Sequence, residues 1–457
     1  MTNPVSGARK KRTVLLCLYG AALVYFILKM AYFAFFAGGF PDQTAQVSYL
    51  IEMCRGPQLL PDFAKLPLYS IVGKTGMTRQ MIADPTSVNY LGHPPLYYLL
   101  LSLTGPVRFL ADGTAEVDFL KLYISNILLT AAGAVLAFRL GYRRLQNRPA
   151  LIHLLFAMAI ATLPELGYVG PSINNDNLAF FAFALFFTGV LRYDEGKQDL
   201  RTYLLIGIGF LLGSFSKLTT ALVMLIMLVV ILVMSVIRTK SLKLIANRYF
   251  LATLPCYLLF LTYEILVYRR YGGWQPGLAL VAPDYFRTSV FYVAPENRAP
   301  LTVGQYAGKF LGGIGYTWGS LYGHNGSIND RMNNGVAGLV YWIPAGASVC
   351  AAVIQAVRKK ADRYTIPAVL AFLGTLAYHF WTGWSGFLKN GYTGGAQARY
   401  YLPLVIPFAL IFCEQFFPDP KTKKARIITV AIAVLLVILW LAGDAPRLVP
   451  ALGFSPI

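Results

Sequence analysis

The run LTTALVMLIMLVVILVMSVI, residues 218–237, contains no charged side chain. A helix needs about 20 consecutive apolar residues to cross the hydrocarbon core of a bilayer, and this run is long enough. Similar runs recur along the chain of 457 residues, which is 56% hydrophobic and only 13% charged. Soluble domains carry about 25% charged residues. The sequence therefore predicts an all-α polytopic membrane protein.

The positive charge of the chain is concentrated between these apolar runs. Its formal net charge is +20, from 40 Lys and Arg against 20 Asp and Glu. Short basic clusters between spans are typical of cytoplasmic loops, and this distribution argues against a nucleic-acid-binding surface. We therefore expect membrane lipids, and no nucleic acid, among the partners. The clusters lie at residues 9–12, 143–148, 192–201, 238–248, 358–363 and 421–426.

The basic clusters, taken as cytoplasmic, fix the direction of each span. We expect about 11 transmembrane helices in the inner (cytoplasmic) membrane, with a cytoplasmic N-terminus and a periplasmic C-terminus. Residues 1–268 are expected to form a core that includes a first long outer-face loop, 38–92, with short interfacial helices. A second long outer-face loop, 269–335, and the C-terminal transmembrane helices, 336–457, follow. The expected spans are 13–37, 118–140, 149–166, 174–192, 201–216, 217–237, 248–268, 336–357, 364–383, 399–417 and 427–443.

Residues 93–110 are an apolar segment that does not fit the alternation of inward and outward spans. A full crossing would turn every later basic cluster to the outer side and raise the count to about 12 spans. Pro94-Pro95 begins the segment and Gly105-Pro106 interrupts it. We therefore expect an interfacial or re-entrant segment, which is tolerated where protein buries its backbone.

Acidic and polar motifs stand at the outer ends of the expected spans. Asp42, in Pro41-Asp42-Gln43, follows the first span. A carboxylate at the outer end of a span is desolvated on the membrane side and hydrated on the other, and this environment suits a general base. The alternative is an ordinary interfacial Asp without a catalytic role. Asp176 opens a later span within Asn174-Asn175-Asp176-Asn177 and is a candidate second acid. The alternative is that Asp176 and its three Asn neighbours cap the helix, which does not exclude a role in the site.

Two cations are placed on the same outer face. Lys217 lies in the tight turn between the spans at 201 and 217, and Arg399 lies at the start of the span at 399. A guanidinium binds phosphate in a bidentate manner, so both residues are candidates for a lipid-linked phosphate. Snorkelling of Lys217 and interfacial anchoring by Arg399 are the alternatives. Candidate substrate contacts are His93, Tyr97, Asn175 and Gln397.

The order of these motifs resembles the GT-C superfamily of polytopic glycosyltransferases, which use polyprenyl-phosphate sugars. The similarity is to the branch with protein O-mannosyltransferases, lipid A aminoarabinose transferases and uncharacterised bacterial relatives. It covers about residues 10–410, mostly as topology. It implies a catalytic acid at Asp42 and carrier-phosphate contacts near Lys217. The matching motifs are Pro41-Asp42, His93-Pro94-Pro95-Leu96-Tyr97-Tyr98, Asn175-Asp176, Ser216-Lys217-Leu218-Thr219 and the Gln-x-Arg-Tyr-x-x-Pro pattern of residues 397–403.

The first motif departs from the family pattern. Its usual form is Asp-Glu, often with a His three residues later, whereas this chain has Gln43 and Gln46 at those positions. The resemblance therefore implies no certain cofactor, and it leaves a divalent metal in doubt. It also leaves Asp42 as the lone acid of its motif, so a non-catalytic member of the family is an alternative.

We expect a membrane glycosyltransferase of the inverting GT-C type. It would move a sugar from a polyprenyl-phosphate carrier to a lipid, glycan or protein acceptor on the periplasmic face. No Walker A pattern or Rossmann glycine fingerprint is present, which agrees with a donor that is not a soluble nucleotide. A lipid-linked glycan polymerase or ligase and a polytopic transporter or flippase are the alternatives.

Overall fold

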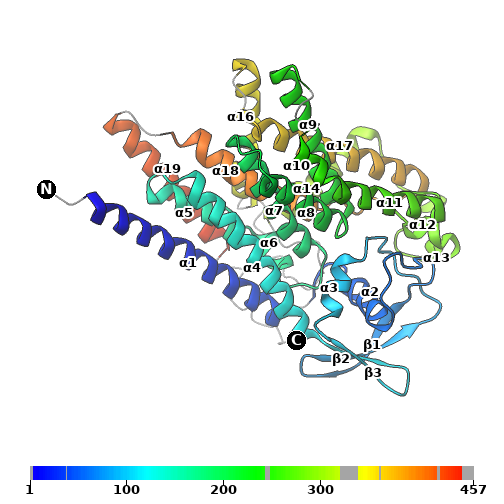
Figure 1. The fold of residues 1–457 in the computed structure, drawn as a ribbon. Coiled ribbons are helices and arrows are strands. Elements are labelled where there is room, and N and C mark those ends of the chain that lie inside the picture. Colours follow the sequence, from blue (N-terminus) through cyan, green and yellow to red (C-terminus); the bar gives the residue numbers. More distant parts are fainter. Residues whose placement is uncertain are drawn as a thin grey trace.

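The computed structural model describes residues 4–37, 39–241, 247–319, 338–359, 362–418 and 422–444. Helices dominate them (Figure 1). Six helical segments in these ranges are long and apolar enough to cross a membrane, by length and composition. The predicted class, a helical polytopic membrane protein, is therefore confirmed, whereas the number of spans stays a prediction. The six segments are Arg9–Phe36, Phe119–Arg144, Leu218–Thr239, Val340–Arg358, Thr365–Asn390 and Lys423–Asp444.

The long helices form a bundle, and shorter helices connect and cover it (Figure 1). The main helices are α1 (Pro4–Phe36), α4 (Phe119–Arg144), α5 (Ala150–Ala161), α7 (Asp176–Asp194), α8 (Leu200–Ser214), α9 (Leu218–Thr239), α11 (Leu254–Tyr271), α14 (Val303–Gly319), α16 (Ile343–Arg358), α17 (Thr365–Asn390), α18 (Val405–Phe416) and α19 (Lys423–Asp444). The short ones are α2 (Gln43–Arg55), α3 (Leu96–Ser102), α6 (Pro164–Val169), α10 (Arg248–Ala252), α12 (Leu278–Val281), α13 (Pro283–Thr288), η2 (Pro295–Asn297), η4 (Val340–Trp342) and η5 (Ala398–Leu404).

Helix α7 packs against α4 and α8 in the middle of the bundle. Glycines allow the α7–α8 contact: a Cβ on Gly209 would lie 2.5 Å from the Phe186 backbone nitrogen, and one on Gly189 would lie 2.9 Å from the Thr202 carbonyl. Small residues at helix contacts are typical of membrane bundles, where close backbone approach replaces the hydrophobic driving force. This close packing holds the N-terminal ends of α7 and α9 near each other.

A small sheet between α1 and α4 was not predicted. Its four antiparallel strands, in the order β1-β2-β4-β3, are β1 (Leu68–Thr75), β2 (Thr78–Asp84), β3 (Val107–Phe109) and β4 (Ala115–Asp118). The sequence predicted short interfacial helices in loop 38–92, and α2 is one of them. The strands escaped notice because β1 is largely exposed on both faces, so its hydropathy does not alternate.

Residues 93–110 contain α3 followed by β3. At a rise of about 1.5 Å per residue, the seven-residue α3 is far too short to cross a bilayer. The segment is therefore not a transmembrane helix, in agreement with the predicted interfacial or re-entrant segment.

Helix α14 lies inside the segment predicted as the second outer-face loop, of which residues 320–335 fall outside the described ranges. Its buried face carries Tyr306, Phe310, Ile314 and Trp318, which follow one another at intervals of four. Interspersed glycines hid this helical period in the sequence. The helix packs on η5, the element that carries Arg399.

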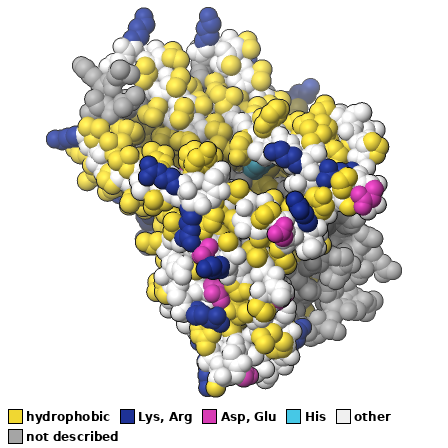
Figure 2. Space-filling view, turned by 90° about the vertical axis from the view of Figure 1, so that its right-hand side faces the viewer, with side chains coloured by type: hydrophobic (Ala, Val, Ile, Leu, Met, Phe, Trp, Pro, Cys, Tyr) yellow, Lys and Arg dark blue, Asp and Glu magenta, His cyan; other side chains and the backbone are white. Residues whose placement is uncertain are grey.

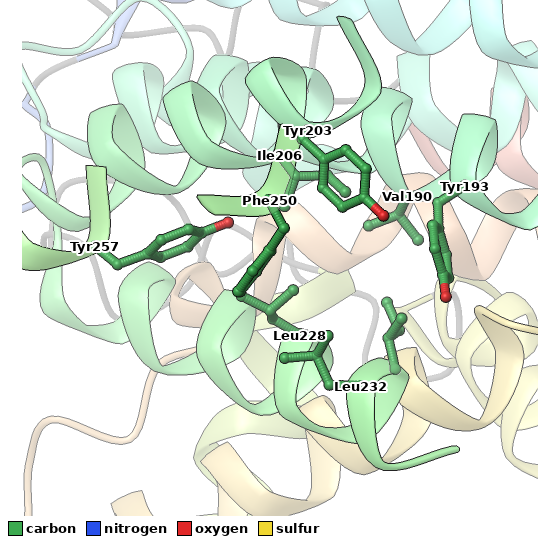
Figure 3. Close-up of a pocket in the computed structure, with 9 residues that line it drawn as sticks. Val190, Tyr193, Tyr203, Ile206, Leu228, Leu232, Phe250 and Tyr257 are labelled. Carbon is green, nitrogen blue, oxygen red and sulfur yellow. The ribbon is translucent and has the colours of Figure 1, made fainter. Parts of the chain in front are cut away.

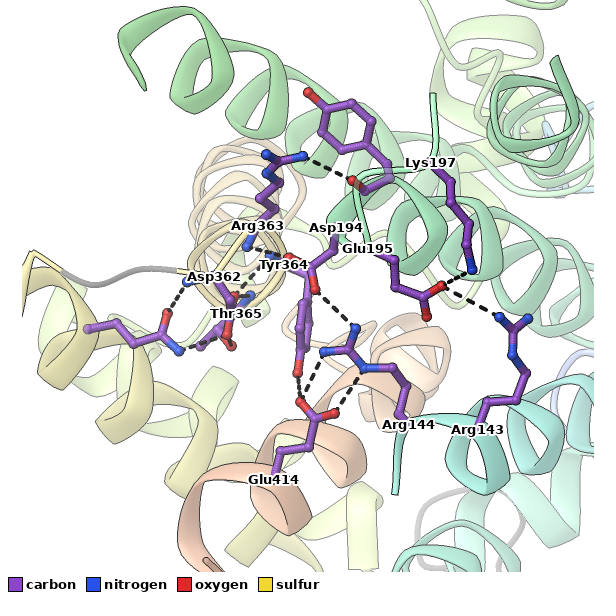
Figure 4. A network of polar contacts seen from close by, with 12 residues as sticks. Arg143, Arg144, Asp194, Glu195, Lys197, Asp362, Arg363, Tyr364, Thr365 and Glu414 are labelled. Carbon is purple, nitrogen blue, oxygen red and sulfur yellow. Dashed lines mark hydrogen bonds and ion pairs between the residues drawn. The ribbon is translucent and has the colours of Figure 1, made fainter. Parts of the chain in front are cut away.

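The ends of α4, α7, α17 and α18 are tied together by ion pairs at one end of the bundle (Figure 4). Arg144 pairs with Glu414 at 3.0 Å and with Asp194 at 3.1 Å, and Tyr364 donates to Glu414. Arg144 belongs to one of the basic clusters predicted to be cytoplasmic. The network therefore joins four helices at the end that is expected to face the cytoplasm.

A second ion pair lies inside the bundle and joins its first and last described helices. Lys29 Nζ of α1 is 2.9 Å from Asp444 Oδ2 of α19, and both side chains are 0% exposed. The Tyr25 hydroxyl donates to the same oxygen at 2.5 Å. Such a pair costs desolvation but fixes which helices pack together.

Charged and apolar side chains divide the surface. Figure 2 shows the face at the right-hand side of Figure 1, where hydrophobic side chains cover most of the upper part, over the helices. Lys, Arg, Asp and Glu side chains gather across its middle and lower part. This division agrees with helices in lipid and with the sheet and α2 in the aqueous layer.

Candidate functional site

Four charged side chains from separate motifs meet where α2, α7, α9 and η5 begin. Arg399 donates to the Asp42 carboxylate, and Lys217 donates to the Asp176 carboxylate. Arg399 Nη1 also lies 4.0 Å from Asp176 Oδ2, which links the two pairs. The structure thus brings together all four charged residues that the sequence singled out, as two cations and two carboxylates. We call them the charged cluster.

Asp42 is the most accessible member of the charged cluster. Its side chain is 28% exposed, whereas those of Arg399, Lys217 and Asp176 are at most 5% exposed. Asp42 has a left-handed backbone, with φ 55° and ψ 16°, and its side chain does not cap α2. A non-glycine residue in this region is uncommon, and Asp and Asn tolerate it best. The turn therefore aims the carboxylate away from the helix and toward Arg399.

The environment of Asp42 keeps it ionised. Burial raises the pKa of this carboxyl, but the Arg399 guanidinium and the hydrogen bonds from Arg399 and Tyr90 outweigh burial and hold the pKa below its ordinary value. The Tyr90 hydroxyl donates to Asp42 Oδ1 at 2.8 Å. Asp42 is thus a carboxylate at neutral pH, fixed by two donors and able to accept a third hydrogen bond.

Asp176 does not itself cap α7; among the four residues for which capping was the alternative interpretation, Asn174 bonds the start of the helix. Asn174 Oδ1 accepts from the Asp176 backbone N–H at 3.0 Å and so satisfies the helix end. The Asp176 carboxylate is left for Lys217 and Arg399. Asn175, predicted to bind substrate, donates its Nδ2 to the Ser216 carbonyl at 3.0 Å and joins the loops that precede α7 and α9.

Lys217 does not snorkel outward. Its side chain is 3% exposed, and its Nζ lies 4.9 Å from the centre of the Tyr400 ring. Arg399 Cζ lies 5.7 Å from the same ring. Tyr400 therefore forms a cation–π platform under both cations. From the sequence, Tyr400 was noted only as the tyrosine of the Gln-x-Arg-Tyr-x-x-Pro pattern that contains Arg399.

His93 lies beside the charged cluster as a neutral ring. Burial and the nearby Lys217 lower its pKa to about 4, against the opposing effect of Asp176 and Asp42. Its Nδ1 is buried and has no hydrogen-bond partner in the described part of the chain. The His93 carbonyl accepts from Tyr49 at 2.9 Å, which holds the loop before α3 against α2.

Tyr97 and Gln397 differ in their access to the cluster. Tyr97 is fully buried and donates to Asn126 at 2.8 Å, so its hydroxyl is used in packing α3 onto α4. Gln397 directly precedes η5, and its Oε1 is buried without a hydrogen-bond partner among the described residues. Tyr90 was missed by the sequence analysis, although it lies three residues before His93.

Unpaired polar atoms gather around the charged cluster. Buried polar groups are normally hydrogen-bonded, so such atoms mark a place where a polar partner fits. Both donors and acceptors occur among them, as a ligand with hydroxyl and phosphate groups requires. Within the described residues, the unpaired atoms near the cluster are Gln43 Oε1, His93 Nδ1, Asn174 Nδ2, Asn175 Oδ1, Asp176 Oδ2, Gln397 Oε1 and Arg399 Nε.

A pocket opens beside the cluster, between α14, α17 and η5. Its volume is about 610 Å³ including open solvent, and Gln397 and Tyr400 line it on the side of the charged cluster. Tyr306, Phe310 and His379 line the rest of its wall, with others. The charged cluster therefore adjoins a cavity with a largely aromatic wall.

The residues at the Asp42 motif do not fit a divalent cation. Gln43 and Gln46 occupy the positions of the family's Glu and His, and the Tyr98 hydroxyl donates to Gln46 Oε1 at 2.6 Å. The Asp42 carboxylate is held by Arg399 and Tyr90. Across the described ranges, no three His, Cys, Asp or Glu side chains are placed to hold a metal ion together.

Comparisons with known proteins found similarity of structure only. No family model and no curated protein matches the sequence. The chain is similar to ArnT from Cupriavidus metallidurans in the apo state, at 12% identity and a TM-score of 0.48, over 96% of this chain and 72% of that one.

Two further structures are similar over smaller shares of their length. The apo oligosaccharyltransferase of Archaeoglobus fulgidus has 13% identity and a TM-score of 0.42, over 93% of this chain and 56% of that one. The S. cerevisiae protein O-mannosyltransferase Pmt1-Pmt2 complex bound to the sugar donor has 15% identity and a TM-score of 0.38, over 59% and 34%. At TM-scores below 0.5, the likeness carries no argument about the chemistry of this chain.

Proposed function

We propose that this protein is a membrane glycosyltransferase that moves a sugar from a polyprenyl-phosphate carrier to an acceptor on the periplasmic face. The observation that carries this proposal is the charged cluster. It combines one accessible carboxylate with two buried cations, and Asp42 and Lys217 lie near the ends of two helices, α1 and α9, that are long and apolar enough to cross a membrane. This is the arrangement that transfer from a lipid-linked phosphate requires.

Asp42 is the general base of the proposed reaction. An acceptor hydroxyl or amine attacks the anomeric carbon of the donor sugar, and its proton passes to the Asp42 carboxylate. The bond between the anomeric carbon and the phosphate oxygen breaks, and the oxygen keeps the electron pair. Attack opposite to the leaving group inverts the anomeric centre. A base fixed by Arg399 and Tyr90 holds one geometry throughout.

Lys217 and Arg399 stabilise the leaving phosphate. A sugar phosphodiester carries one negative charge and gains a second as the bond breaks, so fixed cations beside it favour the transition state over the bound substrate. The two carboxylates balance the charge of the two cations, which offsets the desolvation cost of burying Lys217 and Arg399 when no phosphate is bound. Arg399 Nε, which has no hydrogen-bond partner in the described residues, is a further donor.

The sugar is proposed to lie among the unpaired amides and against the aromatic wall. Asn175, Gln397 and His93 offer hydrogen bonds to hydroxyl groups, and Tyr400 offers a ring face. A neutral His93 can accept or donate at Nδ1 without adding charge. Asp176 orients Lys217 and is the reserve candidate for a second acid.

Reconstitution with defined donors tests this function. The full chain, purified into proteoliposomes, is supplied with radiolabelled polyprenyl-phosphate sugars and a membrane-lipid acceptor fraction. We expect labelled acceptor together with free polyprenyl phosphate. Transbilayer movement of the intact donor without release of polyprenyl phosphate would identify a flippase instead. Transfer of a whole glycan from a pyrophosphate carrier would identify a polymerase or ligase.

A further inference from the structure

The two oxygens of the Asp42 carboxylate face different surroundings. Oδ2 accepts from Arg399, which lies with Lys217 around the Tyr400 ring, on the side of the proposed leaving phosphate. Oδ1 accepts from Tyr90 at 2.8 Å. In the proposed inverting transfer, on which this inference rests, the acceptor attacks opposite to the phosphate. The acceptor is therefore expected on the Tyr90 side of the carboxylate.

Three aromatic rings follow one another on this side. The ring centroids of Tyr90 and Phe291 are 5.0 Å apart, and those of Phe291 and Tyr392 are 5.5 Å apart, both pairs edge to face. All three side chains are only partly buried. Burial and the charge of Asp42 raise the pKa of the Tyr392 phenol, so the carboxylate is close enough to act on this hydroxyl. We call the three residues the aromatic trio.

The segment that carries Phe291, between α13 and η2, is fastened to the end of α17. The Val293 N–H donates to the Asn390 carbonyl at 2.8 Å. Gly391 has a left-handed backbone with φ 72°, and a Cβ there would lie 2.6 Å from Arg298 Cγ, so glycine permits both the turn and the contact. Two rings of the aromatic trio are thus arranged before a ligand arrives, which lowers the entropy cost of binding.

Aromatic rings inside the bundle have a different environment. Figure 3 shows such a group, in which Tyr203, Phe250 and Tyr257 lie around a crevice between α7, α8, α9, α10 and α11. Aliphatic side chains such as Ile206 complete its lining, and the described residues that line it carry no charge. Those rings pack helices together, whereas the aromatic trio borders the accessible carboxylate of Asp42.

The chemistry of the aromatic trio fits a sugar ring. One face of a pyranose presents C–H groups, which the electron-rich face of an aromatic ring attracts, and its rim presents hydroxyl groups. A tyrosine hydroxyl donates to or accepts from such groups, and the Asp42 carboxylate accepts from one of them. A partly buried aromatic surface beside a carboxylate thus matches both the apolar face and the polar rim of the sugar.

Peptide and phospholipid acceptors fit this side less well. An extended peptide binds along a free strand edge, but the edges of the sheet are β1 and β3, and Tyr90 comes after the inner strand β2. The phosphate of a phospholipid head group needs a cation. Arg298, which packs on Gly391, lies over the Tyr292 ring at 5.6 Å and donates to the Val293 carbonyl at 2.9 Å. A sugar ring is therefore favoured.

We propose that the acceptor is a sugar ring of a glycan, which stacks on the aromatic trio and presents one hydroxyl to Asp42. The oxygen of this hydroxyl forms the new bond to the anomeric carbon of the donor sugar, and its proton passes to the Asp42 carboxylate. The carrier phosphate leaves with the bonding electron pair. Phe291 and Tyr392 supply ring faces, and the Tyr392 hydroxyl contacts the rim of the sugar.

Product analysis tests the acceptor class. The full chain in proteoliposomes receives a radiolabelled polyprenyl-phosphate sugar and a membrane fraction that contains lipids, glycans and proteins. We expect partial acid hydrolysis of the product to release the label as a disaccharide. Label recovered on an amino acid or on glycerol phosphate would overturn the acceptor assignment and leave the proposed transferase standing. Absence of any labelled product would overturn the proposed function, and this inference with it.

Variants assign the binding surface. Phe291→Leu and Tyr392→Leu keep an apolar side chain but remove the ring, so each should raise the acceptor concentration for half-maximal rate about two- to tenfold. The donor requirement and the maximal rate should stay unchanged. Phe109→Leu removes an exposed ring of β3 beside Arg55, at the other end of α2, and is the matched control. A lower maximal rate with an unchanged acceptor requirement would show that the rings only position Asp42. Wild-type kinetics in both variants would remove the trio from the site.

Discussion

Asn175 and Ser216 hold each other across 41 residues of chain: Asn175 Nδ2 donates to the Ser216 carbonyl at 3.0 Å, and Ser216 Oγ donates to the Asn175 carbonyl at 2.8 Å. The residue that follows each of them, Asp176 or Lys217, belongs to the charged cluster. The reciprocal bonds therefore set the relative position of two helix starts and, through it, the buried ion pair.

Asp42→Asn is expected to lower transfer by about 10²- to 10⁴-fold, because an amide cannot take the acceptor proton. Asn tolerates the left-handed backbone of this position but leaves the buried Arg399 without its carboxylate, so the unfolding temperature should fall, and rates are compared well below it. Transfer of label from the carrier measures the rate. Asp112→Asn, in an exposed turn, is the control. Wild-type rates in Asp42→Asn would remove the base assignment.

Lys217→Met is expected to destabilise the protein by about 3–5 kcal/mol, because it leaves the buried Asp176 carboxylate unpaired. Adding Asp176→Asn removes that charge and should restore most of the loss without restoring transfer. Thermal unfolding of the single and double variants measures both steps. If the single variant were as stable as the wild type, the pair would not be buried as described.

Arg399→Gln is expected to raise the donor concentration needed for half-maximal rate by about ten- to a hundredfold, through loss of a charged hydrogen bond to phosphate. It also removes the largest effect that offsets burial at Asp42 and leaves Tyr90 and Lys217, so the pKa of that carboxyl rises and the acid limb of kcat/KM moves to higher pH. Arg270→Gln, which removes an exposed pair with Asp62, is the control. An unchanged donor titration and acid limb would place the phosphate elsewhere.

His93 is expected to make the fold sensitive to acid. The unfolded ring takes up a proton near its ordinary pKa of 6.5, whereas the folded ring does so only near about 4. The unfolded chain therefore binds more protons between these values, and stability falls as pH drops through this window. The unfolding temperature of His93→Gln should fall less over the same window. Identical curves for the two proteins would contradict a buried neutral ring.

Single cysteines in a cysteine-free background test the orientation. Cysteines replacing Ala111 and Lys389 are expected to react with an impermeant reagent from the periplasm, and those replacing Gln146 and Thr422 only after permeabilisation. All four side chains are exposed. Reaction at residue 111 only from the cytoplasmic side would invalidate the predicted order of spans.

Helix positions could be predicted because composition acts locally along the chain. The alternation of the basic clusters predicted that Asp42, Asp176, Lys217 and Arg399 lie at one face, and the structure brings their side chains together. The alternation could not give their pairing: Asp42 and Arg399 are 357 residues apart, and only the packed bundle decides which cation meets which acid. Tyr90 was missed for the same reason, because the sequence around it does not indicate a hydrogen bond to Asp42.

The sheet and α14 could not be predicted because their signals are not local. Strand β2 pairs with β4 across the α3 segment, so its partner is set by the fold and not by the neighbouring sequence. In α14, small residues between Tyr306 and Trp318 lower the intrinsic helix propensity. Packing against η5 stabilises the helix instead. Tertiary packing decides both elements.

The buried pair between Lys29 and Asp444 sets an order of events during synthesis. The two residues are 415 positions apart, so Lys29 is made and enters the bilayer long before the carboxylate that will face it exists. A lysine near the middle of a lone helix costs about 2.5–3.5 kcal/mol of insertion free energy. The Leu163 carbonyl, which accepts from Lys29 at 3.3 Å, is available earlier, whereas the neutralising carboxylate is added only with α19, so the charge of Lys29 is balanced late in synthesis.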